Sequence, residues 1–307
     1  MDSCINKTFD DEYMGVCGSG VEWRWKNNIL VIDGNGEMSE PTWRTHTNQE
    51  EILLNTVEVI IGEGVTSIAE EAFDSFKALV SVTIPESVNT IGDSAFHKCT
   101  SLASVSLPKN INIIDGRVFY ECTALNSITI PENVTSIGLG AFADCISLTS
   151  ITIPVSVTSI GIGAFSGCSS LISIVIPNSI DSISESAFEE CTSLVSVSIP
   201  ESVIRIGESA FEHCTSLVSI TIPNSVTTIE DHAFDHCKSL TSVIIPNGVT
   251  LIGPGAFYRC ELLDSVTIPD SVTKIWANAF DMNTELHYFG TNKSVLDYCE
   301  EHNKNIK

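Results

Sequence analysis

Two histidines and several carboxylates recur at one fixed spacing in the second half of the chain. Glu190, His213 and His236 are each separated by 23 residues. A carboxylate directly precedes each of them, at Glu189, Glu212 and Asp235. Imidazole nitrogens and carboxylate oxygens bind divalent ions, so Glu190, His213 and His236 are candidate metal ligands. The same pattern also fits a solvated acidic flank, and we therefore assign no metal from the sequence.

Eight of the eleven cysteines share this spacing and raise a second chemical possibility, disulfides or a thiolate metal site. The equivalent position holds Phe76 near the start of the series and Asn283 near its end. A position that accepts such different residues indicates a packing slot, where free cysteine acts as a small apolar residue. Disulfides or metal between neighbours stay open as alternatives, and Cys4 and Cys17 could pair in an oxidising compartment.

Serine is abundant, but its distribution argues against nucleophilic catalysis. One serine column repeats nine times without a change of residue type, and a nucleophile needs a unique base and oxyanion donors around it. The chain contains no Walker loop, dinucleotide fingerprint or zinc-ligand motif. We therefore expect a protein that is not an enzyme and that needs no cofactor.

The elements that position these residues follow from the period itself. Proline recurs every 23 residues from Pro85 to Pro269, and phenylalanine does so from Phe73 to Phe280. A fixed period of this length is typical of a solenoid, in which each coil covers the apolar surface of its neighbour. The sequence predicts about ten such coils over residues 55–284.

One coil illustrates the expected local structure. Apolar and hydroxyl side chains alternate over residues 148–153, as in a strand with one buried face, and Pro154 should end that strand. Val157 and Ile160 then point inward from a second short extended segment, and Gly161 supports the turn that follows it. Coils stacked at about 4.8 Å would give a rod or shallow arc of about 50 Å, with the phenylalanines packed offset inside.

We expect binding residues at outward-facing repeat positions where the residue type changes from one coil to the next. One exposed strand position is Thr or Ser in seven coils but Val175 and Ile244 in the other two. An apolar side chain on an exposed sheet can anchor a ligand, although isolated exposed apolar residues are also common. The candidate ligand-binding residues are Thr129, Thr152, Val175, Ser198, Thr221 and Ile244.

Composition limits the class of partner. The 307 residues carry a formal net charge of −24, which disfavours nucleic acids and anionic lipids as partners. Apolar residues make up 43% of the chain, yet no run is long enough to span a bilayer, so we expect no membrane insertion. The first residues show no signal-peptide pattern, which leaves a cytoplasmic location possible.

The ends of the solenoid need caps, because an open end exposes apolar surface and strand edges. Residues 1–54 are expected to form a β-rich cap, in which Val21, Trp23 and Trp25 alternate and a turn follows at Asn27-Asn28. Residues 285–307 are expected to close the other end with a short helix in "NKSVLDYCEEHNK".

The repeat L-x-x-I-x-I-P-x-x-V-x-x-I-x-x-x-A-F-x-x-C resembles the BspA-like leucine-rich repeats of bacterial and protozoan surface proteins. The resemblance implies a leucine-rich-repeat solenoid with a parallel β-sheet on its concave side and with short strands, turns or short helices on the convex side. It also implies an adhesin-like protein, at the cell surface or secreted, that binds a protein or glycan on another cell or in a matrix. The alternative is a structural spacer within a larger complex. A further alternative is ice binding through the repeated Ser and Thr hydroxyls.

Overall fold

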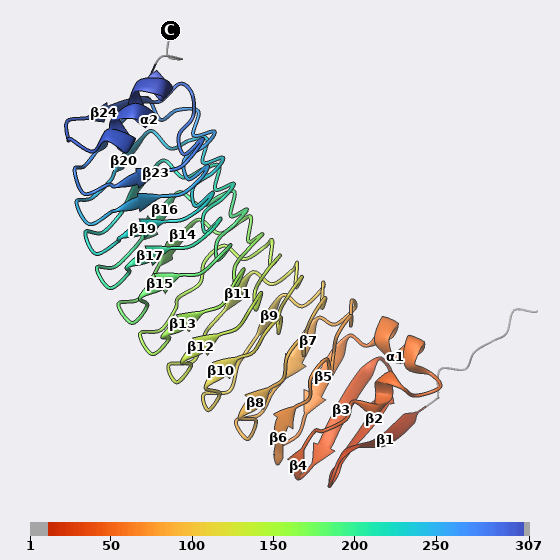
Figure 1. Ribbon diagram of the computed structural model, residues 1–307. Helices are drawn as coiled ribbons and strands as arrows, with labels where there is room; N and C mark the ends of the chain where they lie inside the picture. Colours follow the sequence, from red (N-terminus) through yellow and green to blue (C-terminus); the bar gives the residue numbers. More distant parts are fainter. Residues whose placement is uncertain (1–11, 304–307) are drawn as a thin grey trace, which may run out of the picture.

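The computed structural model describes residues 12–303 as a curved stack of coils between two caps (Figure 1). Within this range no helix is long and apolar enough to cross a bilayer. The N-terminal cap begins with β1 (Tyr13–Gly18), β2 (Val21–Lys26) and β3 (Ile29–Gly34), which pair antiparallel in that order. The short strand β4 (Gly36–Glu37), the 3-10 helix η1 (Thr42–Arg44) and helix α1 (Gln49–Asn55) lead into the repeats.

The first strand of a coil lies near its L-x-x-I segment, and the described coils have one except the coil at residues 148–153. These strands are β5 (Glu58–Ile61), β7 (Ser81–Thr83), β9 (Ser104–Val105), β11 (Ser127–Ile128), β14 (Ser173–Val175), β16 (Ser196–Ser198), β18 (Ser219–Thr221), β20 (Ser242–Ile244), β22 (Ser265–Ile268) and β24 (Glu285–Tyr288). Proline follows the first strand in most coils and turns the chain towards the second strand.

The second strand covers the V-x-x-I segment. These strands are β6 (Val65–Ile68), β8 (Thr90–Ile91), β10 (Ile113–Ile114), β12 (Ser136–Ile137), β13 (Ser159–Ile160), β15 (Ser182–Ile183), β17 (Arg205–Ile206), β19 (Thr228–Ile229), β21 (Leu251–Ile252) and β23 (Lys274–Ile275). A tight turn with the Ala-Phe pair, which we call the Ala-Phe turn, then leads to the next coil.

Where the strands of neighbouring coils pair, they pair parallel, and most pairs are in register. Ser182 lies opposite Arg205, for example, and Ser173 opposite Ser196, a shift of one 23-residue repeat in each case. The expected solenoid of parallel strands is therefore confirmed. In the view of Figure 1 the Ala-Phe turns follow the inner edge of the arc, the proline turns follow its outer edge, and the strands lie between them.

The phenylalanine column forms the centre of the core. Rings from Phe96 to Phe280 are fully buried and stack on their neighbours with centroids 5.1–5.6 Å apart. Trp43 of the N-terminal cap continues the column, because its ring stacks on Phe73 at 5.7 Å and 9°. The column thus joins the cap and the coils into one hydrophobic core.

The Ala-Phe turns are held together by backbone hydrogen bonds. Phe119 N–H donates to the carbonyl of Ala141 at 2.9 Å, and Phe142 N–H repeats the bond to Ala164 at 2.8 Å. Residues two places after each phenylalanine take the left-handed conformation, with φ between 54° and 71° in the coils from Ser75 to Arg259. This regular backbone places the side chains at that position in a column along the turns.

Helix α2 (Lys293–Asn303) closes the C-terminal end of the described chain, as expected for "NKSVLDYCEEHNK". It buries Val295 and Cys299 against the last coil. The side chain of Asn303 accepts a hydrogen bond from Leu286 N–H at 3.1 Å and donates one to the Leu286 carbonyl at 2.9 Å. A side chain thereby satisfies the backbone N–H and carbonyl of Leu286 in the edge strand β24.

The cysteine column lies inside the solenoid. The ten cysteines within residues 12–303 are buried free thiols, and Cys4 lies outside the described residues. Burial raises the pKa of Cys122 and of Cys191 to about 12. The column therefore consists of packing residues, in agreement with the first interpretation of the sequence.

Candidate functional site

The six candidate ligand-binding residues all lie exposed on the surface formed by the first strands, which we call the first-strand face. Val175 is directly opposite Ser198 in the β14/β16 pair, and Thr221 is opposite Ile244 in the β18/β20 pair. Their side chains point away from the core because the strand alternates inward and outward positions. Whether a ligand binds to these residues stays a prediction.

The first-strand face consists of short separate sheets, in which β5 pairs with β7, β9 with β11, β14 with β16, β18 with β20 and β22 with β24, and the coil between β11 and β14 has no first strand. Residues 148–153 show the expected alternation, with Ile151 and Ile153 buried and Ser150 and Thr152 exposed, but no strand is assigned there. Strand β11 pairs with β9, and β14 pairs with β16, so the ladder stops on both sides of this coil. Alternation of side chains sets which residues face inward, whereas a ladder also needs neighbouring backbones within hydrogen-bonding reach.

Two hollows flank the interrupted coil. The first, of about 300 Å³, is lined by residues of three coils that include Ser127, Thr129 and Thr152. The second, of about 540 Å³, is lined by Thr152, Val155, Val175 and Ser198 among others. Four of the six candidates therefore line these hollows, and Thr221 and Ile244 lie on the next two coils.

Val155 is a surface residue that sequence reasoning missed. Its side chain is 77% exposed and lines the larger hollow together with Val175, which is 67% exposed. In the other coils from Pro85 to Pro269, the residue after the repeated proline is polar or charged, so Val155 breaks that column. The sequence could have shown this break. Two apolar side chains that line one hollow also make a better anchor than either one alone.

A further apolar column runs beside the first strands. Ile172, Val195 and Val218 occupy one repeat position in three successive coils, and each is about half exposed. The first-strand face thus combines hydroxyl groups with a contiguous set of aliphatic side chains near β14, β16 and β18. Such a mixture can bury apolar surface of a partner while the hydroxyls form hydrogen bonds.

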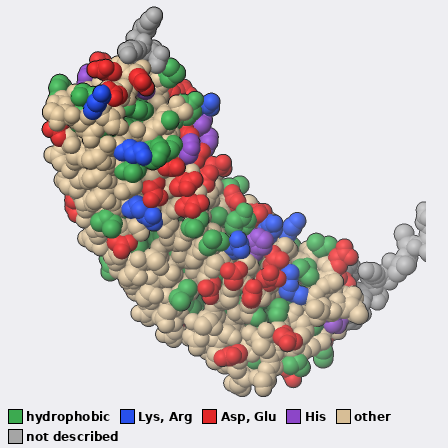
Figure 2. Space-filling model, in the orientation of Figure 1, with side chains coloured by type: hydrophobic (Ala, Val, Ile, Leu, Met, Phe, Trp, Pro, Cys, Tyr) green, Lys and Arg blue, Asp and Glu red, His purple; other side chains and the backbone are tan. Residues whose placement is uncertain are grey.

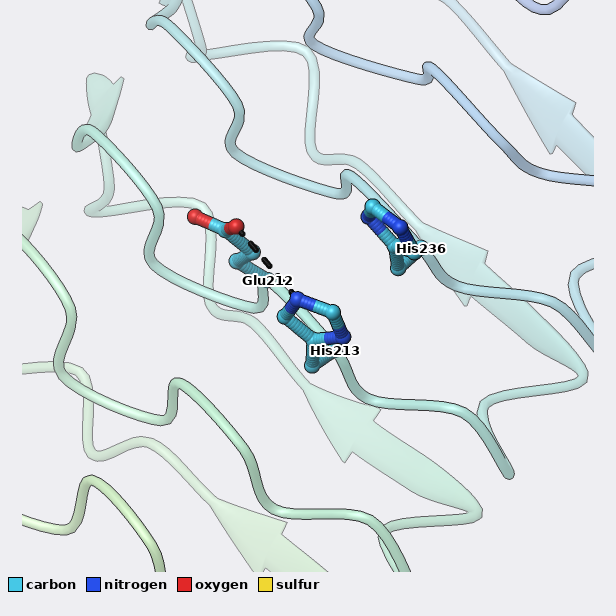
Figure 3. A group of neighbouring side chains, drawn as sticks. All are labelled: Glu212, His213 and His236. Atoms are coloured by element: carbon cyan, nitrogen blue, oxygen red, sulfur yellow. Dashed lines mark ion pairs between the residues drawn. The ribbon is translucent and has the colours of Figure 1, made fainter.

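The acidic and histidine side chains gather on the Ala-Phe turns, along the inner edge of the arc in Figure 2. His213 and His236 stack with ring centroids 4.2 Å apart and an interplanar angle of 24°. Glu212 Oε1 lies 3.6 Å from His213 Nε2, and Figure 3 shows this contact as a dashed line. The structure therefore brings two of the three candidate metal ligands together and adds Glu212, whereas Glu190 does not belong to this group.

Burial and like charges affect the carboxylates around this group. The pKa of Glu189 is raised, first by burial and then by repulsion from Glu212 and Glu190, against a hydrogen bond from Ser186. Asp235 is only 5% exposed and lies beside both His232 and His236. Several carboxylates on the turns of these coils thus lie close to two imidazoles and create a negative electrostatic potential there.

A third hollow, of about 720 Å³, lies on the Ala-Phe turns nearer the N-terminus. Small residues such as Gly140, Gly163 and Ala143 line it together with Lys98, Arg117 and Tyr120. Burial raises the pKa of Tyr120, and the neighbouring Asp144 adds to the shift. The sequence analysis did not identify this region, although its polar lining residues come from only three repeat positions, two places before and one and two places after each phenylalanine.

Comparison with known proteins agrees with the geometry. The family model described as the BspA type leucine-rich repeat region matches residues 53–172 and 158–287. No curated protein matches the chain.

Several solved structures are similar. A leucine-rich cell surface protein from Faecalibacterium prausnitzii is 26% identical, with 91% of this chain and 96% of that chain covered and a TM-score of 0.51. The leucine-rich repeat protein of T. pallidum is 27% identical, with 64% and 88% covered and a TM-score of 0.51. A leucine-rich repeat protein from Eubacterium ventriosum is 22% identical, covers 89% and 95%, and shares the fold with a TM-score of 0.50.

Three findings lead to one assignment: the 23-residue period, the parallel pairing of neighbouring coils, and the family match over residues 53–287. The chain belongs to the BspA-type leucine-rich repeat family.

Proposed function

We propose that this protein is a non-catalytic, adhesin-like binding protein that acts at a cell surface and contacts a protein or glycan through its first-strand face. The observation that carries the proposal is the hollow lined by Val155 and Val175 on a face that otherwise presents hydroxyl groups. The location is supported by the likeness to a bacterial leucine-rich cell surface protein. The repeated, equivalent serines offer no unique catalytic group, which supports a binding role.

The size of the surface suits a macromolecular partner better than a small molecule. The two hollows are open and span the coils from Ser104 to Pro200, so a ligand would meet many shallow contacts. Affinity on such a surface concentrates in a few buried anchors, and the two valines are the best candidates for them. The net charge of −24 favours cationic or neutral partner surfaces.

The test is a binding screen of the purified chain against matrix proteins, glycans and whole cells. Val175→Lys and Val155→Lys should each weaken a saturable interaction at least tenfold, because a charged group would have to be buried against the partner. Thr152→Lys should have a similar effect. The matched control is Ile204→Lys, since Ile204 is 52% exposed but lies beside the second strand β17, away from these hollows.

The alternative function is that of a spacer within a larger complex. It would be favoured if no ligand in the panel bound, or if binding occurred but was equally sensitive to Ile204→Lys and Val175→Lys.

A further inference from the structure

Two imidazoles and one carboxylate converge on the Ala-Phe turns of neighbouring coils, away from the first-strand face. His213 and His236 occupy the same repeat position and have nearly the same backbone conformation, with φ of 59° and 58°. His213 N–H donates to the Asp235 carbonyl at 2.8 Å, and His236 N–H donates to the Tyr258 carbonyl at 2.9 Å. The backbone ladder therefore fixes the positions from which both rings project.

The donor atoms are close enough to share one ion. One ligand atom each of Glu212, His213 and His236 lies within 4.8 Å of the others. Zinc binds nitrogen and oxygen at about 2.0–2.2 Å in a tetrahedron, which places two ligand atoms about 3.3 Å apart. The donor atoms must therefore approach one another by at most about 1.5 Å, which side-chain torsion changes in these partly exposed residues can supply.

Asp235 supports the use of His236 as a ligand. Asp235 Oδ1 lies 2.7 Å from His236 Nδ1, yet neither buried atom has a well-directed hydrogen-bond partner among the described residues. A small rotation of the ring would align this pair. A carboxylate on one ring nitrogen is the usual outer partner of a metal-bound histidine, because it fixes the tautomer that leaves Nε2 free to bind.

We propose that Glu212, His213 and His236 form a binding site for a divalent transition-metal ion such as Zn²⁺. Two imidazole nitrogens and one carboxylate oxygen favour zinc, copper or nickel over calcium or magnesium, which prefer oxygen ligands. Three protein ligands leave a fourth position for water or for a group of a partner molecule.

Arg259 competes for one of the ligand atoms. Its Nη1 lies 3.0 Å from His236 Nε2, so the guanidinium donates to the lone pair that the ion requires. The guanidinium carbon also lies 5.3 Å from the ring centroid of Tyr258, over the ring face. Metal binding must displace Arg259 from His236, and the arginine thereby sets the affinity of the site.

The test is calorimetric titration of the full chain with Zn²⁺. The wild type should bind one ion in a saturable manner, and His213→Asn or His236→Asn should weaken binding at least tenfold. Asparagine is chosen because it tolerates the left-handed backbone at these positions and removes the imidazole. Glu212→Gln should weaken binding severalfold, whereas His97→Asn, which removes a histidine from a distant Ala-Phe turn, should leave it unchanged.

Arg259→Gln provides the sharpest comparison. It should tighten zinc binding severalfold, because the competing guanidinium is lost while the three ligands remain. An unchanged affinity would overturn coordination through His236 Nε2. The site itself is refuted if the wild type binds no Zn²⁺, or binds it no better than the His213→Asn/His236→Asn double variant when circular dichroism shows both proteins to be folded.

Discussion

The thiol of Cys122 donates a hydrogen bond to the carbonyl oxygen of Phe96, 3.1 Å away in the preceding coil. The same carbonyl accepts the N–H of Cys99 at 3.2 Å, so it is shared between two coils. The thiol bond recurs in all eight coils of the cysteine column, at 3.1–3.3 Å. Each cysteine thus connects its coil to the phenylalanine column of its neighbour.

Thiol labelling should separate these cysteines from reactive ones. Because burial raises the pKa of Cys122 and Cys191 to about 12, little thiolate forms at pH 8 and the native protein should react with a disulfide reagent only slowly. Addition of guanidinium chloride should expose all of them to rapid labelling. Mass spectrometry that found Cys122 or Cys191 rapidly labelled in the native protein would contradict this prediction.

The same shifts predict a loss of stability at alkaline pH. A thiol released by unfolding ionises above its ordinary pKa of 9.0, whereas in the native state Cys122 stays protonated up to about 12. The unfolded chain therefore binds fewer protons than the native one in this window, and the free energy of unfolding falls as pH rises. Each such thiol contributes up to about 1.4 kcal/mol per pH unit.

Urea unfolding at pH 8, 9 and 10 measures this slope. The double variant Cys122→Ala/Cys191→Ala should lose less stability between pH 9 and pH 10 than the wild type, although it starts from a lower value. Equal slopes for the two proteins would show that these thiols do not cause the effect.

Removal of a ring from the phenylalanine column should be strongly destabilising. Phe142 is fully buried and stacks on Phe119 and Phe165, with centroids 5.5 and 5.4 Å away. Phe142→Ala should cost about 3–5 kcal/mol, from lost burial and from the cavity. The control is Phe289→Ala, because Phe289 is 86% exposed and its loss should change the free energy of unfolding by about 0.5 kcal/mol at most. Comparable losses in the two variants would contradict the assigned core.

Gly161 should resist substitution because neighbouring backbones approach closely. A Cβ at this position would lie 2.6 Å from the backbone of Gly138 and Leu139 in the preceding coil. Gly161→Ala should therefore cost about 1–3 kcal/mol in thermal or urea unfolding. Asp115 occupies the same repeat position and already carries a side chain, so Asp115→Ala is the matched control with a small expected effect. A neutral Gly161→Ala variant would show that the coils can separate at this point without cost.

Much of the fold follows from the periodic residues alone. The spacing of proline, phenylalanine and cysteine indicated stacked coils, and the structure places the phenylalanines and cysteines inside. Gly161 was expected to support a turn, and its carbonyl does accept the Ala164 N–H at 3.2 Å at the start of that turn. The structure adds that Gly161 permits close contact between coils. The contribution of Trp43 to the phenylalanine column was not foreseen, because it lies in the cap and outside the period.

The candidate sites were only partly accessible from the sequence. Column breaks identified Val175, and the same criterion applied to the residue after each proline would have identified Val155. For the metal ligands, the spacing aligned His213 and His236 with Glu190, but the structure joins them to Glu212. Repeat position specifies the backbone from which a side chain projects, whereas the rotamer and the tilt between coils determine which donor atoms meet.

The sequence by itself determined the period of the coils and which side of each strand faces the core, because alternation and burial are local properties repeated every 23 residues. The tertiary structure alone decided where the first-strand ladder is interrupted, which side chains share a hollow, and that Arg259 lies on the nitrogen of His236 that a metal would need. These features depend on separations of a few ångströms between neighbouring coils. Curvature, backbone hydrogen bonds and side-chain torsions set such distances together, and a repeat pattern does not encode them one by one.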